Sequence, residues 1–253
     1  MAFPRTVNLD YGDEKKESSS AIGNLSVGTR GVTPDGRVFY YAKNSSAAIT
    51  TGGQIVDGIA AVAAHDMDVA STATSVGGLT VTSGTSLTVT KNQYQDGYII
   101  FNDGPGQGEV YRIASNTAVS GATGLSVTIA DPGGFRTALT TSSLFGLAYN
   151  PYTDVKIIDG DGTMTTGALG VTTIPVTASY YCWIQTAGIA SVLSGAVVAV
   201  VGDAVGVSQA SGESGAFDLW DVSTNEDTFP IGVAMNVASV DTDYQIVDLK
   251  IRF

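Results

Sequence analysis

Short segments with strand character recur along most of the chain. After the turn signal Thr33 to Gly36, residues 37–42 are rich in Val, Phe and Tyr, and similar segments follow at residues 53–62, 79–81, 87–90, 98–101, 110–113 and 125–129. Polar and apolar residues alternate with period two in residues 80–82 and 86–90, as they do in half-buried strands. The pattern therefore predicts a first block of short antiparallel strands over residues 33–153.

A second series of such segments begins near Asp154. It comprises residues 154–158, 171–177, 180–185, 191–201, 204–207, 231–237 and 244–253. Pro175 restricts its segment to an edge strand or a bulge, because proline cannot donate to a ladder. In the last segment apolar and polar residues alternate, although Ile246 interrupts the alternation. These residues predict a second β block over residues 154–253, and the pattern leaves open whether the blocks are separate domains or one continuous sandwich.

No segment has the periodicity of a long amphipathic helix. Residues 59–70 are rich in Ala and favour a short helix about as much as a strand that ends in a loop. The abundance of Gly, Thr, Ser, Val and Ala is typical of β proteins. We therefore expect an all-β chain with two sandwich-like or barrel-like blocks.

The first residues differ from the rest. Residues 10–20 are dense in charges of both signs, have no apolar periodicity and end in a run of Ser. A polar terminus of this kind has no core of its own. We expect residues 1–32 to form an extended N-terminal arm that lies across a neighbouring subunit.

Charge is absent from a long internal stretch. Residues 162–202 contain no Asp, Glu, Lys, Arg or His, and charged residues make up only 14% of the chain. Polar residues interrupt every apolar run, and the longest run, residues 196–201, is far shorter than the roughly 20 residues of a membrane-spanning helix. We interpret the stretch as surface that is buried against protein, which predicts no membrane association and an oligomer interface that includes Tyr181, Trp183 and Gln185.

The formal net charge of −12 and the scattered basic residues predict no binding to nucleic acid. The N-terminus lacks the basic and apolar regions of a secretory signal, so we expect synthesis and retention in a cytoplasm. With one cysteine, no internal disulfide is expected.

Residues with catalytic potential are few. The single His65 has no G-x-S-x-G elbow to partner, and one His with the distant Cys182 is too small a set for zinc. Cys182 lies in an apolar segment and is expected to be a buried small hydrophobe. We therefore predict that the chain is not an enzyme and has no catalytic, cofactor-binding or metal site.

Three patterns resemble sites but favour simpler explanations. Asp159 to Thr163 begins like a calcium loop, but its later ligand positions carry Thr163, Met164 and Gly170, which favours a polar turn. The Gly-rich segment 102–108 lacks the Lys-Ser/Thr of a phosphate loop and is expected to connect a hairpin. Neighbouring loop carboxylates are more typical of turns than of a glycosidase pair; these are Asp66 and Asp68, Asp218 and Asp221, and Asp241 and Asp243.

Several segments, taken in order, resemble a family of head proteins of tailed bacteriophages. They are residues 33–43 (TPDGRVFYYAK), 92–103 (NQYQDGYIIFND), 108–113 (GEVYRI), 150–152 (NPY) and 180–188 (YYCWIQTAG). Residues 195–207, the acidic loop that follows and residues 231–235 are similar to the small β-barrel of capsid decoration, or cement, proteins. The resemblance covers about residues 30–253 and does not include the N-terminal arm.

The resemblance implies a structural virion protein on the outer surface of an icosahedral phage head. Its partners would be the major capsid protein and itself, as a homotrimer that clamps neighbouring capsomers against internal DNA pressure. It implies no active site and no cofactor. We expect the arm to contact the capsid or a neighbouring copy through Phe3, Arg5, Tyr11, Lys15 and Lys16.

Other functions stay open at this point. Within the virion, the chain is compatible with a tail-tube protein or a head fibre base, whereas the missing long helix disfavours a major capsid protein. Outside that class, a carbohydrate-binding receptor-recognition module would use Trp183, Trp220 and the tyrosines for stacking, but no repeat period of a β-solenoid spike is found. An ordinary β-sandwich enzyme is disfavoured by the single His and the charge-free stretch.

Overall fold

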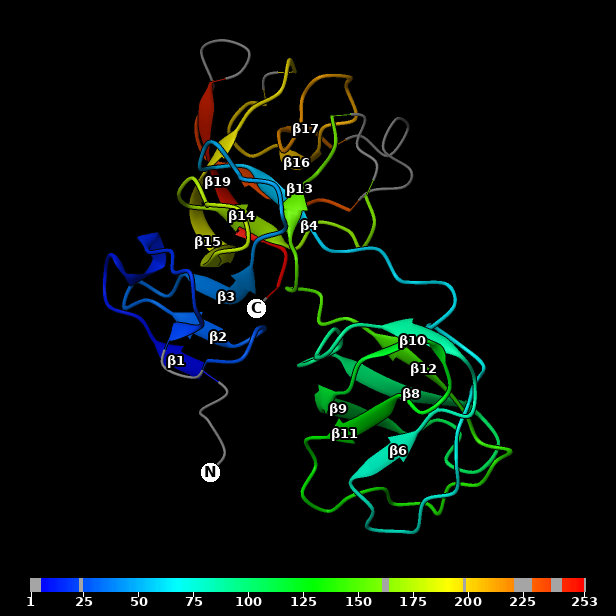
Figure 1. Cartoon of the computed structure of the whole chain (residues 1–253). Helices are drawn as coiled ribbons and strands as arrows, with labels where there is room; N and C mark the ends of the chain where they lie inside the picture. The colour runs from blue at the N-terminus through cyan, green and yellow to red at the C-terminus, as the bar shows by residue number, and fades with distance from the viewer. Residues whose placement is uncertain are drawn as a thin grey trace. The chain divides into compact units, whose positions relative to one another are not determined.

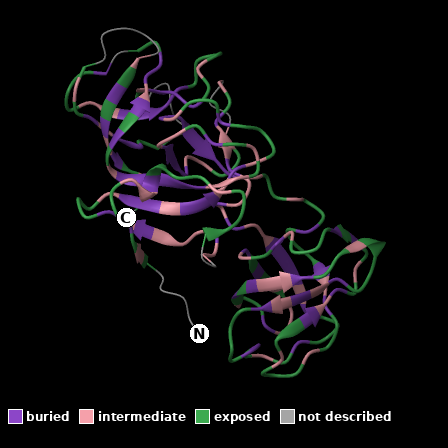
Figure 2. Ribbon diagram, turned by 60° about the vertical axis from the view of Figure 1, so that its left-hand side comes forward, coloured by how far each residue is buried: buried purple, intermediate pink, exposed green. Residues whose placement is uncertain are grey.

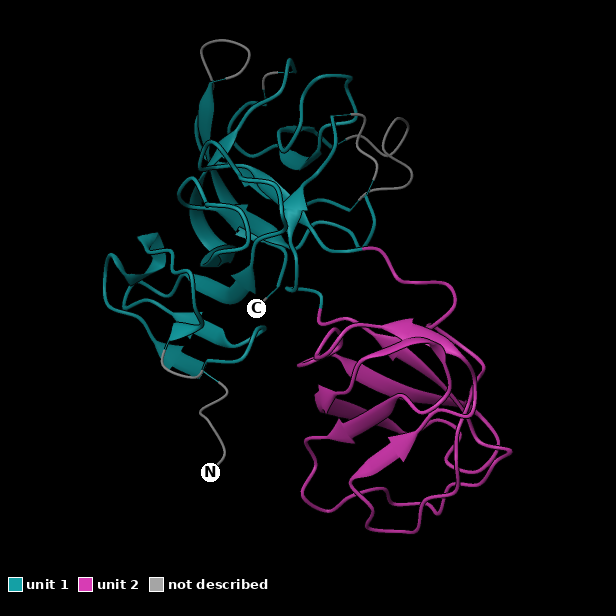
Figure 3. Cartoon of the chain, viewed as in Figure 1, with its two compact units in different colours: residues 1–59, 151–253 teal, residues 60–150 magenta. Residues whose placement is uncertain are grey.

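The chain forms two compact units, shown separately in Figure 3. Unit 1 comprises residues 1–59 and 151–253, and unit 2 comprises residues 60–150. The computed structural model describes residues 6–22, 25–160, 164–197, 199–220, 229–237 and 243–252. These residues contain no α-helix, and most strand pairs are antiparallel, so the all-β prediction is confirmed.

The sheet of unit 1 is built around one long strand (Figure 1). This strand, β15 (Tyr181–Leu193), pairs with β3 (Val38–Lys43) along its first half and with β19 (Tyr244–Lys250) along its second. The path through the sheet is β1-β2-β3-β15-β19-β18-β16-β17. Its other strands are β1 (Thr6–Asn8), β2 (Arg30–Val32), β16 (Ala204–Val207), β17 (Phe217–Leu219) and β18 (Gly232–Ala234). Residues 182–187 of this strand are buried on both faces of the sheet, which explains the nearly continuous apolar character of that part of the strand.

Three shorter strands extend the same sheet. They are β4 (Ile55–Asp57), β13 (Lys156–Ile157) and β14 (Gly170–Thr172), and β14 joins β4 to β15. The strand predicted at residues 171–177 ends at Thr172, before Pro175. Beyond the ladder, Val176 and Ile49 form an isolated antiparallel bridge.

Unit 2 is a curled antiparallel sheet. Its strand order is β5 (Val69–Ala70), β12 (Leu144–Ala148), β8 (Tyr98–Asp103), β9 (Val110–Asn116), β11 (Ser126–Ile129) and β6 (Thr80–Thr82). A bridge between Ser71 and Ser83 joins the ends of the first and last strands, and β7 (Leu87–Val89) pairs with β10 (Val119–Ala122). Edge-to-face contacts among aromatic rings fill the interior, which contains Phe101, Tyr111, Phe135 and Phe145.

The predicted division into blocks 33–153 and 154–253 differs from these units. Strands β3 and β4 belong to unit 1, where they pair with β15 and β14, and only residues 60–150 form unit 2. A period-two pattern shows that a segment is a strand but does not show which distant strand completes its hydrogen bonds. Residues 59–70 form a turn followed by β5, with no helix.

The predicted N-terminal arm is wrong for the described residues 6–22 and 25–32. Strand β1 runs parallel to β2 in the sheet of unit 1, and a short 3₁₀ helix, η1 (Asp13–Lys15), follows it. Figure 2 shows buried residues concentrated on the strands and exposed residues on many of the connections. The Leu9 side chain anchors the N-terminal segment, because it is buried against Phe39, Tyr41 and Trp183.

Candidate interaction surfaces

The N-terminal segment is fixed to unit 1 by specific contacts. The backbone N–H of Leu9 donates to the carbonyl of Val32 at 2.9 Å, and the Leu9 side chain is only 5% exposed. Gly31 makes room for it, since a Cβ there would lie 2.7 Å from Leu9 Cδ1. Farther along, the Glu17 carboxylate accepts hydrogen bonds from the backbone N–H and hydroxyl of Thr177, at 2.6 and 2.8 Å. The segment is therefore part of the body of unit 1.

Three of the predicted capsid-contact residues are exposed on this segment. Tyr11 is 65% exposed, and Lys15, the last residue of η1, and Lys16, which follows it, are also exposed. The ammonium group of Lys16 contacts the Asp13 carboxylate at 2.7 Å. Phe3 and Arg5 lie outside the described residues.

The predicted oligomer-interface residues lie mainly inside the chain. Trp183 is 3% exposed and packs against Tyr41, with ring centroids 5.1 Å apart. Gln185 is 1% exposed, and its amide nitrogen donates to the carbonyls of Ala187 and Ile189. Buried in their own subunit, these two side chains are not available to a partner, and that part of the prediction is wrong.

Tyr181, the third of these residues, is half-buried. Its ring stacks on Tyr41 at a centroid distance of 5.7 Å, and its backbone forms a bridge with Ser18. Within the charge-free stretch, residues 182–187 of β15 are buried by other parts of the same chain, whereas Val197, Val200 and Val201 are at least half exposed.

A different surface of unit 1 exposes apolar side chains, and we call it the outer face. It is formed by Ile189 on β15, Tyr244 and Ile246 on β19, and Met235 directly after β18, which are 43–49% exposed. Successive strand residues point to opposite sides of a sheet, so these residues alternate with the buried Ala190, Gln245 and Val247. The interrupted alternation at Ile246 was the sequence signal for this face.

A groove of about 460 Å³ adjoins the outer face. Gln185, Ile189, Ser191 and Tyr244 contribute to its lining, together with residues of the 171–173 segment and two basic residues, Lys15 and Arg37. Arg37 forms ion pairs with Asp35 at 2.8 Å and with Glu14 at 3.4 Å.

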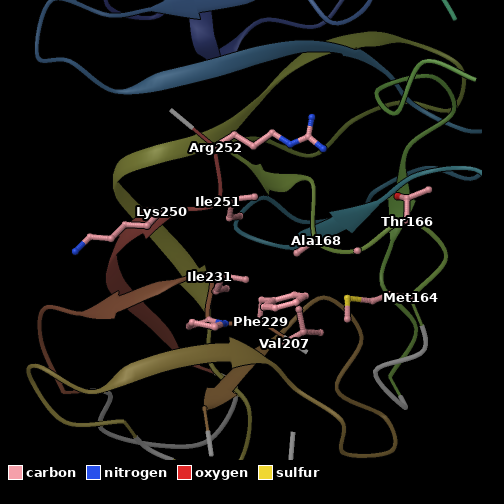
Figure 4. Close-up of a pocket in the computed structure, with 11 residues that line it drawn as sticks. Met164, Thr166, Ala168, Val207, Phe229, Ile231, Lys250, Ile251 and Arg252 are labelled. Atoms are coloured by element: carbon pink, nitrogen blue, oxygen red, sulfur yellow. The ribbon is translucent and has the colours of Figure 1, made fainter. Parts of the chain in front are cut away.

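A second pocket of unit 1, of about 540 Å³, is shown in Figure 4. Its lining is mainly apolar, with Lys250 and Arg252 as its charged members. Phe229, Val207 and Ile231 gather on one side in this view. The arrangement suits an apolar group, and the described residues of its lining include no carboxylate, cysteine or histidine side chain.

Unit 2 also exposes an apolar strand face, which we call the β8–β9 face. It contains Tyr98 and Ile100 on β8, 39% and 38% exposed, and Val110 on β9, 55% exposed. Ile100 lies directly opposite Val110, and Tyr98 lies opposite Arg112, which forms an ion pair with Asp96 at 2.8 Å.

Two carboxylates of unit 1 share one hydroxyl. The Ser208 hydroxyl oxygen lies 2.6 Å from Glu213 and 2.7 Å from Asp218. A hydroxyl has one hydrogen to donate, so it can donate to one of the two carboxylates at a time. Burial, reinforced by the nearby Glu213, raises the pKa of Asp218 above its usual value. The carboxylates also accept the backbone N–H groups of Ala196 and Val197, so they position the loop after β15.

Other reactive side chains are occupied in structural roles. Burial raises the pKa of the Cys182 thiol to about 12, which keeps it protonated and unreactive at neutral pH. Among the described residues, no group of three or more His, Cys, Asp or Glu is placed to hold a metal ion. In the same part of the chain, no helix has the length and apolar character required to cross a membrane.

His65 is buried in unit 2. Its Nδ1 lies 2.7 Å from the Tyr94 hydroxyl, and the two rings meet edge to face. Desolvation by burial lowers the pKa of His65 below 6.5, outweighing the opposite effect of the Asp66 carboxylate. The folded unit therefore holds this imidazole neutral at pH values where the unfolded chain protonates it.

This burial predicts a pH-dependent stability of unit 2. The contribution of His65 to the stability of unit 2 is fully present above pH 6.5. It is lost as the pH drops below 6.5, because the unfolded state then binds more protons than the folded state. Hydrogen exchange of unit 2 peptides between pH 7.5 and 5.5, corrected for the intrinsic exchange rate, measures the effect. A His65→Gln variant should lose most of the dependence, and an unchanged dependence would show that another group causes it.

The chain was compared with protein-family models, curated proteins and solved structures, and no match was found in any of the three.

Proposed function

We propose that this chain is a structural virion protein that binds the outer surface of an icosahedral phage head as a decoration, or cement, protein. The sequence resemblance over residues 30–253 supports this function. Its segments include strands β3, β8, β9 and β15, which belong to the sheets of the two units. The partner is the major capsid protein, and the expected assembly is a homotrimer.

The observation that carries the proposal is that each of the two β units exposes an apolar strand face. Unit 1 has the outer face, with Ile189 and Ile246, and unit 2 has the β8–β9 face, with Ile100 and Val110. A soluble chain with two such faces can engage two neighbours at once. When one chain binds two neighbouring sites on a closed shell, the two modest contacts act together, and the chain is held more strongly than by either contact alone.

The fixed N-terminal segment supplies a third contact in this proposal. Tyr11, Lys15 and Lys16 are exposed on a segment that is already held against unit 1, so the segment needs no ordering when it docks. In this proposal the ammonium group of Lys15 would meet acidic residues of the capsid, and the Tyr11 ring would supply a contact beside it. Phe3 and Arg5 precede this group in sequence and belong to the same proposed contact.

Reversal of one of these charges tests the capsid contact. We expect Lys15→Glu to weaken binding to decoration-free capsids about five-fold to ten-fold, because an attractive surface charge becomes repulsive. Co-sedimentation with capsids at increasing protein concentration measures the dissociation constant. The defect should shrink at high salt, where surface charges are screened.

The matched control is Lys91→Glu, which makes the same charge change at an exposed residue of unit 2. It should bind like the unmodified protein. Equal weakening by both variants would assign the effect to net charge, and unmodified protein that does not sediment with capsids would refute the function itself.

A carbohydrate-binding module is the second candidate. The observation that favours it is the exposed Tyr98 beside the Arg112–Asp96 ion pair, since an aromatic ring flanked by hydrogen-bonding groups is a common way to hold a sugar. Binding on a glycan array that is lost in Tyr98→Ala would support this candidate over capsid decoration.

A further inference from the structure

We propose that Ser208, Glu213 and Asp218 form a proton-dependent latch on residues 194–197, the start of the loop that follows β15. The latch is closed while Asp218 carries a proton and is weakened when Asp218 ionises. The proposal concerns the response of unit 1 to pH and does not depend on capsid binding.

The number of hydrogens in the latch requires a protonated carboxyl group. The Ser208 hydroxyl oxygen lies 2.6 Å from Glu213 Oε2 and 2.7 Å from Asp218 Oδ2, and it accepts the backbone N–H of Ala210 at 3.2 Å. A hydroxyl has a single hydrogen and an ionised carboxylate has none, so two ionised carboxylates leave one of these short contacts without a hydrogen. With a proton on one carboxyl group, Ser208 donates to the other group and accepts from the protonated one. Both short contacts are then hydrogen bonds.

The proton is more stable on Asp218. Burial raises the pKa of this residue above the usual 3.8, and the nearby Glu213 raises it further. Asp218 Oδ2 then donates to Ser208, whose own hydrogen goes to Glu213 Oε2. The other two carboxyl oxygens accept backbone N–H groups of the loop. Ala196 donates to Glu213 Oε1 at 3.0 Å, and Val197 donates to Asp218 Oδ1 at 3.1 Å.

The described residues offer no cation to the two carboxyl groups, because their ion pairs are made with other carboxylates. Strand β16 and residues 194–197 contain no charged side chain. The other charged residues on neighbouring segments are Lys156 and Asp159, paired with each other at 3.5 Å, Asp203, which accepts the N–H of Val200, and Asp243, whose carbonyl accepts the N–H of Ser194. The charge that acts on Asp218 is therefore that of Glu213.

The latch reaches the backbone of the loop at Gly195. A Cβ there would lie 2.6 Å from Asp218 Oδ1 and would collide with Glu213 Oε2, so both carboxyl groups can approach only a glycine. Loss of the Asp218 proton removes the hydrogen bond from Asp218 to Ser208 and leaves two neighbouring carboxylates that repel each other.

One effect of ionisation opposes this loss. The Val197 N–H forms a stronger hydrogen bond with an ionised carboxyl group than with a protonated one. Burial and the charge of Glu213 outweigh that gain, because the pKa of Asp218 is raised. The contribution of the Asp218 proton to stability is therefore present at low pH and is lost as the pH rises through this raised pKa. The direction is opposite to that of His65 in unit 2.

Carbon-13 NMR of the Asp218 carboxyl group in the full-length protein tests the protonation. In a titration from about pH 3 to about pH 8, the midpoint should lie above the usual 3.8, and the Val197 amide signal should move with the same midpoint. An Asp218 carboxyl group that ionises at or below 3.8 in the folded protein would overturn the proposal.

Hydrogen exchange of the Ala196 and Val197 amides, corrected for the intrinsic rate, tests the latch itself. Exchange should become about five-fold faster when Asp218 ionises, the factor expected for the loss of one hydrogen bond. Asp218→Asn keeps a donor toward Ser208 and an acceptor toward Val197 but cannot ionise, so both amides should stay protected over the whole range. Exchange that does not change across the Asp218 titration would refute the latch.

The matched control is Asp203→Asn, since Asp203 accepts the N–H of Val200 at 2.9 Å in the same loop. This variant should keep the pH dependence of the Ala196 and Val197 amides. Loss of the dependence in Asp203→Asn would assign the effect to another carboxylate and overturn the proposal. If Asp218→Asn does not fold, the two measurements on the unmodified protein still decide the outcome.

Discussion

Replacement of Leu9 by alanine is expected to lower the free energy of unfolding of unit 1 by about 3 kcal/mol, within the usual range for a buried leucine. Leu9 is 5% exposed and fills the space between Gly31 and Trp183, so its loss leaves a cavity under the N-terminal segment. Urea unfolding followed by tryptophan fluorescence is a selective measurement, because both tryptophans, Trp183 and Trp220, belong to unit 1.

The matched control is Ile22→Ala in the same N-terminal region. Ile22 is 40% exposed, and its contact with Tyr41 is made through its backbone N–H, which alanine retains. A change below about 1 kcal/mol is expected for this variant, since little apolar area is removed from the interior. Equal, small effects of both substitutions would mean that the N-terminal segment is not packed against the sheet and would restore the predicted arm.

Gly146→Ala is expected to destabilise unit 2 by about 3 kcal/mol, at the upper end of the usual cost of overpacking. A Cβ at Gly146 would lie 1.9 Å from the carbonyl oxygen of Asp66 and 3.3 Å from the backbone nitrogen of Met67. The obstacle is backbone, which cannot swing aside as a side chain can. The neighbouring Leu147 donates its N–H to the carbonyl of His65 at 2.7 Å. A shift of residues 65–67 away from the new Cβ would therefore also break this hydrogen bond.

Gly84→Ala gives the control for this substitution. A Cβ there meets its nearest atoms at 3.6–3.8 Å, ordinary van der Waals distances, and its φ is not in the left-handed region. Alanine at Gly84 should be neutral or slightly stabilising, because it restricts the unfolded chain. Differential scanning calorimetry with hydrogen exchange of unit 2 peptides compares the two variants, and a harmless Gly146→Ala would contradict the close approach of residues 66–67.

The sequence was sufficient to predict the class of fold, because strand periodicity and turn residues are local signals. It was not sufficient to predict the pairing of β3 with β15, whose paired residues are as far apart in sequence as Val38 and Ala187. That pairing places β3 in unit 1, and the pairing of β4 with β14 and β13 places residues 55–57 there. Local patterns carry no information on loop closure between such distant segments.

The candidate surfaces show the same division between local and distant information. Residues 10–20 have no apolar periodicity, yet Leu9 just before them and the hydrogen bonds of Glu17 fix the segment to the sheet. The lack of charge around Trp183 indicates burial, but it cannot indicate whether the cover comes from the same chain or from another. Ile246 was different, because a large apolar residue at an outward strand position is a local signal of an exposed apolar face.

The most direct test of the proposed decoration function is a cryo-electron microscopy reconstruction of decoration-free capsids incubated with the purified protein. The proposal predicts additional density at symmetry-related positions on the outer surface, over contacts between capsomers, into which unit 1 and unit 2 each fit. Capsids that stay bare at saturating protein concentration would contradict it, as would density confined to the tail.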